Sequence, residues 1–199
     1  MTSREQLTGA MAELLWERGY AATSPRDVMA RAGVGQGSMY HHFRGKHELA
    51  VEAMSAVIAD MMSDSSVLVG DGSPVERIKR YLLLPRPGTR GCRVGRMTQD
   101  PQVVTDAELL ALIADAFDTM LDRWEAAIAE AVGAGELPRS INPRDLARTL
   151  SAVLQGGYVL ARAKGEQEPM DAAIRGAVAL LDAARSAAGE TNPPQKETS

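Results

Sequence analysis

The spacing of apolar residues constrains this chain more than any other feature. Leu112 and Ile113 follow Leu109 at spacings of three and four residues, and the pattern continues to Ile128. This is the period of an α-helix with one apolar face, so the sequence predicts one long helix over about 106–132. Similar patterns fill almost the whole chain, and no segment alternates with the period of a strand. We therefore expect an all-α fold of about nine helices.

Helix-capping residues mark where the other helices begin and end. The segment 3-SREQ-6 has the form of a capping box, and the apolar pattern that follows it ends at Gly19. A second capping box, 24-SPRD-27, has proline at the first helical position, and its helix ends near Gly33. The remaining helices are expected over about 36–43, 46–65, 74–84, 106–132, 143–164 and 170–187.

Composition and charge limit the classes of function. The chain has 199 residues, of which 45% are hydrophobic and 24% charged, and its net charge is −4. The first 50 residues hold six basic and five acidic side chains, whereas the rest hold sixteen and twenty-one. Only the N-terminal region therefore suits contact with phosphate groups. No apolar run is long enough to span a bilayer and no signal peptide is recognised, so with its single cysteine, Cys92, we expect the protein in a reducing cytoplasm.

Residues 24–43 have the organisation of a helix-turn-helix. The turn 33-GVG-35 leads from the first helix of this motif into a short second one. Three apolar side chains would face the preceding helix as core: Val34, Met39 and Phe43. The positions that project outward where recognition helices meet base edges are Gln36, Gly37, Ser38 and His41. The side chains of types that hold phosphates are Tyr40, His42 and Lys46.

The span 5–55, centred on TSPRDVMARAGVGQGSMYHHFRGKHEL, resembles the DNA-binding domain of the TetR/AcrR family of transcriptional repressors. In that family (Thr/Ser)-x-x-(Asp/Glu)-(Ile/Val)-Ala precedes Gly-Val-Ser-x-Gly-(Ser/Thr)-Leu-Tyr-x-(His/Tyr)-Phe. This chain departs from the pattern at Gly35, which replaces the usual serine cap of the recognition helix, and at Met29, where alanine is usual. The resemblance implies that bases are read by Gln36, Gly37 and Ser38. It implies contacts to the DNA backbone, some of them shared with bases, for Arg26, Tyr40, His41, His42 and Lys46.

The three histidines do not indicate a metal site. His41 and His42 are adjacent, so on a helix their side chains diverge by about 100°. No carboxylate or cysteine in the sequence obviously completes a ligand set with them or with His47. We expect neither a metal nor another cofactor.

The resemblance also implies how the rest of the chain is organised. We expect a helix-turn-helix DNA-binding domain over 1–47, a ligand-binding and dimerisation domain over 48–188, and a disordered tail over 189–199. Members of the family form homodimers, usually through the last two long helices, which here are those about 143–164 and 170–187. A small hydrophobic inducer would then release the homodimer from a palindromic operator in double-stranded DNA.

Two further segments resemble a subgroup of the family that has a Gly-Cys motif at the start of its ligand-binding domain. They are 91-GCRVGRMTQDP-101 and 155-QGGYVLARA-163, and Arg93 and Arg96 depart from the subgroup pattern. Met and aromatic residues at helical spacing are more often plain core than ligand contacts, but as a group they are the candidates for an inducer pocket. The candidate residues are Met97, Phe117, Met120, Leu121, Trp124, Gln155 and Tyr158.

Cys92 offers an alternative, in which the repressor senses electrophiles or oxidants through its thiol. Seven Lys or Arg residues and no acidic one lie between Glu76 and Asp100, and nearby cations favour the thiolate form of cysteine. A modified Cys92 would then bias the geometry of the dimer. An alternative of equal weight is that Cys92 is a buried, inert residue. The basic segment would then be a solvated loop or a cradle for an anionic effector.

Two other classes fit the sequence poorly. An enzyme is a distant alternative, because the histidines lie far from Cys92 in the sequence and no paired carboxylates indicate a catalytic cleft. A purely architectural DNA-binding protein is disfavoured, because the long amphipathic body exceeds what bending DNA requires. The residues do not distinguish a repressor from an activator.

Overall fold

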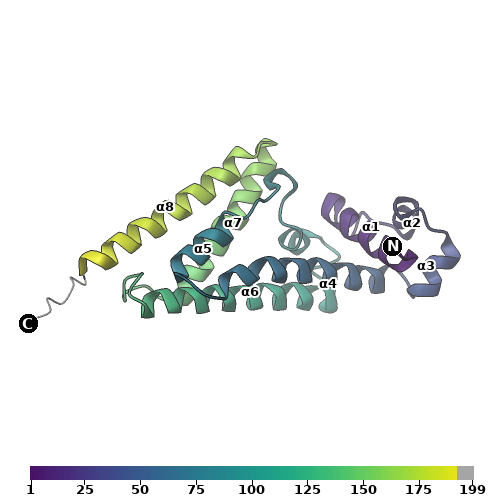
Figure 1. Cartoon of the computed structure of the whole chain (residues 1–199). Helices are drawn as coiled ribbons and strands as arrows, with labels where there is room; N and C mark the ends of the chain where they lie inside the picture. The colour runs from purple at the N-terminus through teal and green to yellow at the C-terminus, as the bar shows by residue number, and fades with distance from the viewer. Residues whose placement is uncertain (192–199) are drawn as a thin grey trace, which may run out of the picture. The chain divides into compact units, whose positions relative to one another are not determined.

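The computed structural model describes residues 1–191, with side chains through Gly189 (Figure 1). These residues form eight α-helices and three short 3₁₀ helices, and none of them lies in a strand. The predicted all-α fold class is therefore confirmed. The last helix continues through Thr191, so most of the tail predicted over 189–199 lies outside the described residues.

One compact unit consists of residues 1–63 and 90–117. The four N-terminal helices lie in it, together with a short 3₁₀ helix and the first part of a long helix. They are α1 (Ser3–Arg18), α2 (Pro25–Ala32), α3 (Gln36–His42), α4 (Lys46–Asp64), η3 (Gly95–Gln99) and α6 (Ala107–Gly133). Their apolar faces form one core, in which Leu7, Met11 and Leu49 are fully buried.

A second compact unit consists of residues 64–89 and the described chain from Asp118 onward. Its elements are η1 (Ser65–Leu68), α5 (Pro74–Leu82), most of η2 (Gly88–Arg90), the rest of α6, α7 (Pro143–Lys164) and α8 (Glu168–Thr191). Helices α7 and α8 pack against each other (Figure 1). Their approach is close at Gly157, where a Cβ atom would lie 2.6 Å from the sulfur of Met170. In the core of this unit Trp124 is fully buried, with its ring edge-on to Tyr81.

Local sequence explains most of the helix ends. Helix α2 begins with the predicted capping box, in which the Ser24 hydroxyl accepts from the Asp27 N–H and the Asp27 carboxylate accepts from the Ser24 N–H. The predicted box at the start of α1 is wrong by one residue, because Thr2 and Glu5 form it. Thr and Ser both make good N-caps, so the sequence alone does not decide between Thr2 and Ser3.

The compact units do not follow the predicted functional boundary at residue 47. The segment 90–117 packs with the N-terminal helices, and so does α4, apart from its last residue. A division by function is a different matter from a division by packing. The domains 1–47 and 48–188 therefore stay a prediction.

Candidate nucleic-acid interface

The turn between α2 and α3 depends on Gly33. Its φ of 67° and ψ of 31° lie in the left-handed region, which glycine adopts without the strain of a Cβ atom. Gly35 then begins α3 in an extended conformation, and no side chain caps the helix. Helix α2, this turn and α3 together form the predicted helix-turn-helix.

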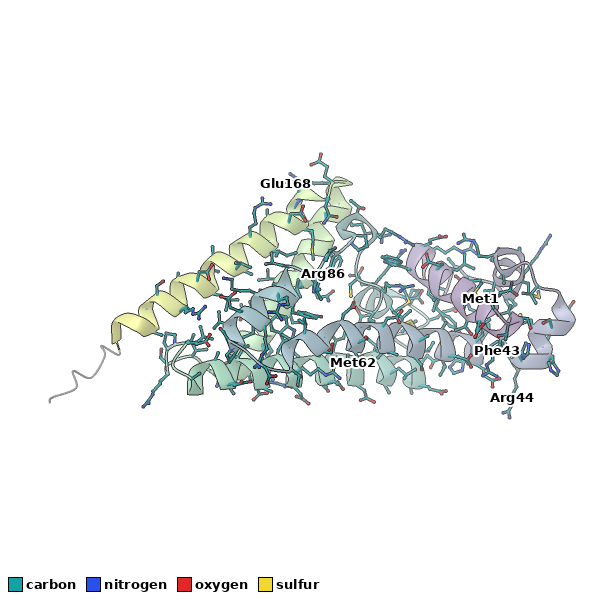
Figure 2. The ribbon with its side chains drawn as sticks, viewed as in Figure 1. Met1, Phe43, Arg44, Met62, Arg86 and Glu168 are labelled. Atoms are coloured by element: carbon teal, nitrogen blue, oxygen red, sulfur yellow. The ribbon has the colours of Figure 1, made fainter. Side chains whose placement is uncertain are left out.

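One side of α3 is held in the core of the first unit. Met39 is fully buried, and Phe43, directly after the helix, is 1% exposed. Val34 is half-buried and packs against the same core. The next residue after Phe43, Arg44, is exposed and projects away from the ribbon (Figure 2). The three side chains predicted to face inward therefore do so.

The other side of α3 presents hydrogen-bonding groups to the outside. Gln36, Gly37 and His41 are exposed, Tyr40 is 51% exposed and Ser38 is half-buried. On α2, Arg26 is exposed as well. An amide, a hydroxyl, a phenol and an imidazole on the outer side of one short helix, with no carboxylate among them, suit contact with base edges and phosphate oxygens.

Two of the predicted DNA-binding side chains also have partners within the protein. The Nε2 atom of His42 lies 2.8 Å from the hydroxyl of Ser3, in the first turn of α1. The Nζ atom of Lys46 lies 3.9 Å from the centroid of the Tyr20 ring. Burial lowers the pKa of Lys46, and the charge of Asp100 opposes part of that shift. Both side chains therefore help to hold the unit together, which sequence reasoning did not anticipate.

The segment Arg90–Asp100, here called the 90–100 loop, is fastened to the end of α1. The indole Nε1 of Trp16 donates to the carbonyl oxygen of Gly91 at 2.8 Å, and the guanidinium of Arg90 lies 3.4 Å from the centroid of the Trp16 ring. The Arg96 guanidinium donates to the carbonyl oxygens of Trp16 and Glu17, which lie in the last turn of the helix. No local sequence pattern indicates these contacts, because the partners lie 75 to 80 residues apart in the chain.

Asp100 fastens the end of the same loop. Its carboxylate is buried and accepts from the backbone N–H groups of Ala21 at 2.9 Å and Gln102 at 3.0 Å. Arg90 and Arg93 form ion pairs with Glu13 at 2.8 and 3.1 Å. The arginines of the 90–100 loop thus have partners inside the unit, which weakens the hypothesis that they form a cradle for an anionic effector.

Cys92 lies half-buried within the 90–100 loop. Its Sγ atom accepts a hydrogen bond from the Gly95 N–H at 3.2 Å, at the start of η3. This contact supports a structural role in the turn. It gives no specific support to the alternative of a thiol sensor.

The predicted inducer-binding residues are divided between the two units. Cys92, Met97 and Phe117 belong to the first unit, and the second unit holds Met120, Leu121, Trp124, Gln155 and Tyr158. Met97, Met120 and Trp124 are buried, whereas the other five are half-buried. Within the first unit, Met97 lies with Tyr20 and Met54 around an apolar gap that is too small to hold a water molecule. An ordinary ligand site encloses about 300–1,000 Å³, so this gap is not a formed inducer pocket.

The described residues also bear on two other features, metal sites and membrane-spanning helices. No group of three or more His, Cys, Asp or Glu side chains among those residues is arranged to hold a metal ion. His47 instead lies 2.9 Å from the carboxylate of Asp106. No helix within residues 1–191 is both long and apolar enough to cross a membrane.

The fold and the exposed face of α3 define the class of helix-turn-helix DNA-binding proteins, and comparison with known proteins identifies the family. Residues 7–53 match the family described as bacterial regulatory proteins, tetR family. Residues 75–177 match the tetracyclin repressor-like, C-terminal domain. The chain therefore belongs to the TetR family. It is a DNA-binding transcriptional regulator and not an enzyme.

Similar proteins agree with this assignment. The HTH-type transcriptional repressor DhaR of Mycobacterium sp. (strain GP1) is 26% identical over 84% of this chain and 86% of its own. The transcriptional regulator AcuR of Cereibacter sphaeroides is 27% identical over 87% of this chain and 82% of its own. The crystal structure of regulatory protein TetR from Rhodobacter sphaeroides superposes with a TM-score of 0.79, covering 89% of this chain and 97% of that one at 24% identity. That structural likeness concerns the fold.

Proposed function

We propose that the protein acts in the cytoplasm as a homodimeric repressor that a small hydrophobic ligand releases from a palindromic operator. The observation that carries this proposal is the two-sided character of α3. Met39 is buried in the core, whereas Gln36 and Tyr40 on the same short helix are exposed. A recognition helix needs this arrangement, because one side must be held rigidly while the other enters the major groove. The related protein DhaR is named a repressor, which favours repression over activation.

Each of the predicted DNA-binding residues has a role in this proposal. Gln36 pairs with adenine, Ser38 donates to or accepts from a base edge, and Gly37 leaves room for a thymine methyl group. The groups that contact the DNA backbone are Arg26, Tyr40, His41, His42 and Lys46. The first fifty residues carry almost no net charge, so we expect few phosphate contacts and weak non-specific binding at cellular salt.

Exposed apolar side chains on α7 and α8 support the homodimer. Val159 and Leu160 on α7 are 58% and 56% exposed, and Leu180 on α8 is 73% exposed. Large apolar side chains that are exposed on two helices packed against each other are candidates for a protein interface. We propose that α7 and α8 of two protomers form a four-helix interface, which would set the two α3 helices about one turn of DNA apart, roughly 34–36 Å.

The inducer is proposed to bind among the residues that the sequence singles out. They are Cys92, Met97, Phe117, Met120, Leu121, Trp124, Gln155 and Tyr158. We also propose that the chain belongs to the corresponding subgroup of the family, and the Gly-Cys segment at 91–92 supports this. An inducer acts by preferring the state that does not fit DNA, and it shifts the equilibrium by no more than its difference in affinity for the two states.

Selection of DNA from a random library by the purified protein tests this function. The expected result is a palindromic site that is bound saturably and lost when an inducer is added. Enrichment of a site without two-fold symmetry would contradict the homodimer. If no sequence is enriched, the proposed operator binding is wrong.

Substitution of Gln36 tests the assignment of base contacts on α3. Gln36→Ala is expected to relax sequence preference at one base position in each half-site, by about 1–3 kcal/mol, because it removes a bidentate contact. Tyr40→Phe should instead weaken binding to all sequences alike, because it removes a contact to the backbone. Competition binding with operators altered at single positions measures both effects. An unchanged preference in Gln36→Ala would show that Gln36 reads no base.

A further inference from the structure

Helix α3 receives little support from its own sequence. It has seven residues, and Gly35 gives it no side-chain cap. An isolated helix of this length is unstable in water. Its position therefore depends on contacts from other elements, among which buried Met39 and Phe43 hold its inner side.

The first turn of α1 holds the C-terminal end of α3. The hydroxyl oxygen of Ser3 lies 2.8 Å from Nε2 of His42, the last residue of α3, and both side chains are half-buried. Beside Ser3, the guanidinium of Arg4 lies 5.0 Å from the centroid of the Phe43 ring. Arg4 is itself held by an ion pair with the Glu52 carboxylate of α4. The contact between Ser3 and His42 is thus flanked by the contacts that Arg4 makes with Phe43 and Glu52.

The hydrogen bond to Nε2 has a chemical consequence for the other ring nitrogen. A neutral imidazole has one N–H donor and one acceptor nitrogen, and a hydroxyl can either donate or accept. The partner of one nitrogen decides where the proton lies. Phosphate oxygens only accept, so a neutral histidine binds a phosphate well only if the nitrogen that meets the phosphate carries the proton.

We propose that Ser3 is a positioning residue for DNA binding. Its hydroxyl donates to Nε2 of His42 and so fixes the neutral ring in the tautomer with the proton on Nδ1. The Nδ1–H group then donates to a phosphate oxygen of the DNA backbone. This inference rests on the proposed function, because it requires His42 to contact the DNA backbone.

The fold does not need the Ser3 hydroxyl for any other contact that we observe. Thr2 is the N-cap of α1, and Glu5 completes its capping box. Alanine is also a better helix former than serine. Ser3→Ala should therefore leave the thermal unfolding midpoint nearly unchanged, which separates positioning from folding.

Operator affinity is the first readout. Ser3→Ala is expected to weaken binding about three- to tenfold, the equivalent of one hydrogen bond, and to do so equally for matched and altered operators. Ser3→Thr, which keeps the hydroxyl, should restore affinity. In a double variant with His42→Ala, Ser3→Ala should cause no further loss. The matched control is Ser55→Ala on α4, where the hydroxyl bonds only to the Val51 carbonyl oxygen of its own helix, and it should bind normally.

The ¹⁵N chemical shifts of the histidine rings are the second readout, in the protein without DNA. The chain has three histidines, so the signals of His42 can be assigned by their loss in His42→Ala. We expect the Nδ1–H tautomer for His42 in the wild type and a shift toward Nε2–H in Ser3→Ala. His47, which pairs with the Asp106 carboxylate at 2.9 Å, should give the same signals in both proteins.

Two results would overturn the inference: a wild-type His42 with its proton on Nε2, or full operator affinity in Ser3→Ala. Failure of the proposed function is distinguishable from both, because the wild type would then select no DNA at all. In that case Ser3 would have no role in DNA binding either. The ¹⁵N shifts of His42 would still show whether the Ser3 hydroxyl donates to Nε2.

Discussion

At the scale of single residues, the least expected side chain is a buried arginine in the second unit. The side chain of Arg77, on α5, is 3% exposed. Its guanidinium pairs with the Glu130 carboxylate of α6 and donates to the carbonyl oxygen of Gly70. A buried charge is costly unless it is paired. Glu130 therefore matters more to stability than its own exposure of 56% suggests.

Glu130→Gln is expected to lower the free energy of unfolding by about 2–3 kcal/mol, because it leaves a buried guanidinium without its counter-charge. Urea denaturation followed by circular dichroism measures the change. The matched control is Glu168→Gln, whose partner Arg175 is 64% exposed, and it should change stability by less than about 0.5 kcal/mol. Equal losses in the two variants would show that the burial of Arg77 adds nothing.

The candidate site itself shows which residues can be predicted from sequence. The inward and outward positions of α3 follow from helical spacing and from the family motif, so Met39 and Gln36 lie as expected. The partner of His42 was not predictable, because Ser3 is 39 residues away and no local pattern joins them. For the same reason, the sequence showed that basic residues gather around Cys92 in the chain, but it could not show that Glu13 pairs with two of the arginines.

At the scale of elements, helix bounds were predictable wherever a cap or a glycine marks them. Helix α7 spans the predicted 143–164, because Asn142 caps it and Gly165 ends it in the left-handed region. Helix α5 ends two residues before the predicted Leu84. The irregular segment that follows α5 was predictable as a loop from its Pro and Gly content. Its course was not, because contacts with distant helices decide it.

One such contact is the close approach of Gly88 to α7 and α8, which can be tested with two glycine substitutions. A Cβ atom at Gly88 would lie 2.8 Å from the Cβ of Met170 and 3.0 Å from the Cβ of Ala161. Gly88→Ala is therefore expected to lower the free energy of unfolding by about 1–3 kcal/mol. Gly9→Ala, in α1, meets nothing within 4 Å and should raise it by about 0.5–1 kcal/mol. Thermal unfolding of the two variants measures both, and a stabilised Gly88→Ala would mean that the segment can move away.

At the scale of the whole molecule, paired carboxylates make stability depend on pH. The hydrogen bond from Arg4 lowers the pKa of Glu52, and backbone N–H groups at the start of α6, with His47, lower that of Asp106. A carboxyl group whose pKa is lowered by folding stabilises the folded state above its ordinary pKa. That stabilisation is lost as the pH falls through the lowered value.

The free energy of unfolding is therefore expected to decrease as the pH falls below about 4.5, the ordinary pKa of a glutamate. Urea denaturation at a series of pH values between 7 and 3 measures this dependence. Glu52→Gln removes one of the titrating groups, so its curve should be flatter than that of the wild type. A stability that rises with acidity would contradict the assigned ion pairs.

The proposed homodimer gives a prediction for the assembly. Leu180→Glu places a charge where an apolar contact is proposed, so the protein is expected to become monomeric and to lose operator binding by at least tenfold. Sedimentation velocity and operator titration measure the two effects. Val104→Glu is the matched control, because Val104 is also an exposed apolar side chain, at 44%, and it belongs to the first unit, whereas α7 and α8 belong to the second. A dimeric Leu180→Glu protein would place the interface elsewhere.

The fastening of the 90–100 loop to Trp16 has a practical consequence for spectroscopy. The chain has two tryptophans, and each compact unit holds one, Trp16 in the first and Trp124 in the second. Trp124→Phe leaves a fluorophore whose emission reports whether the loop is attached to α1. Trp16→Phe leaves one that reports the core of the second unit. Fluorescence titrations of these two single-tryptophan proteins would follow the melting of each half of the molecule separately.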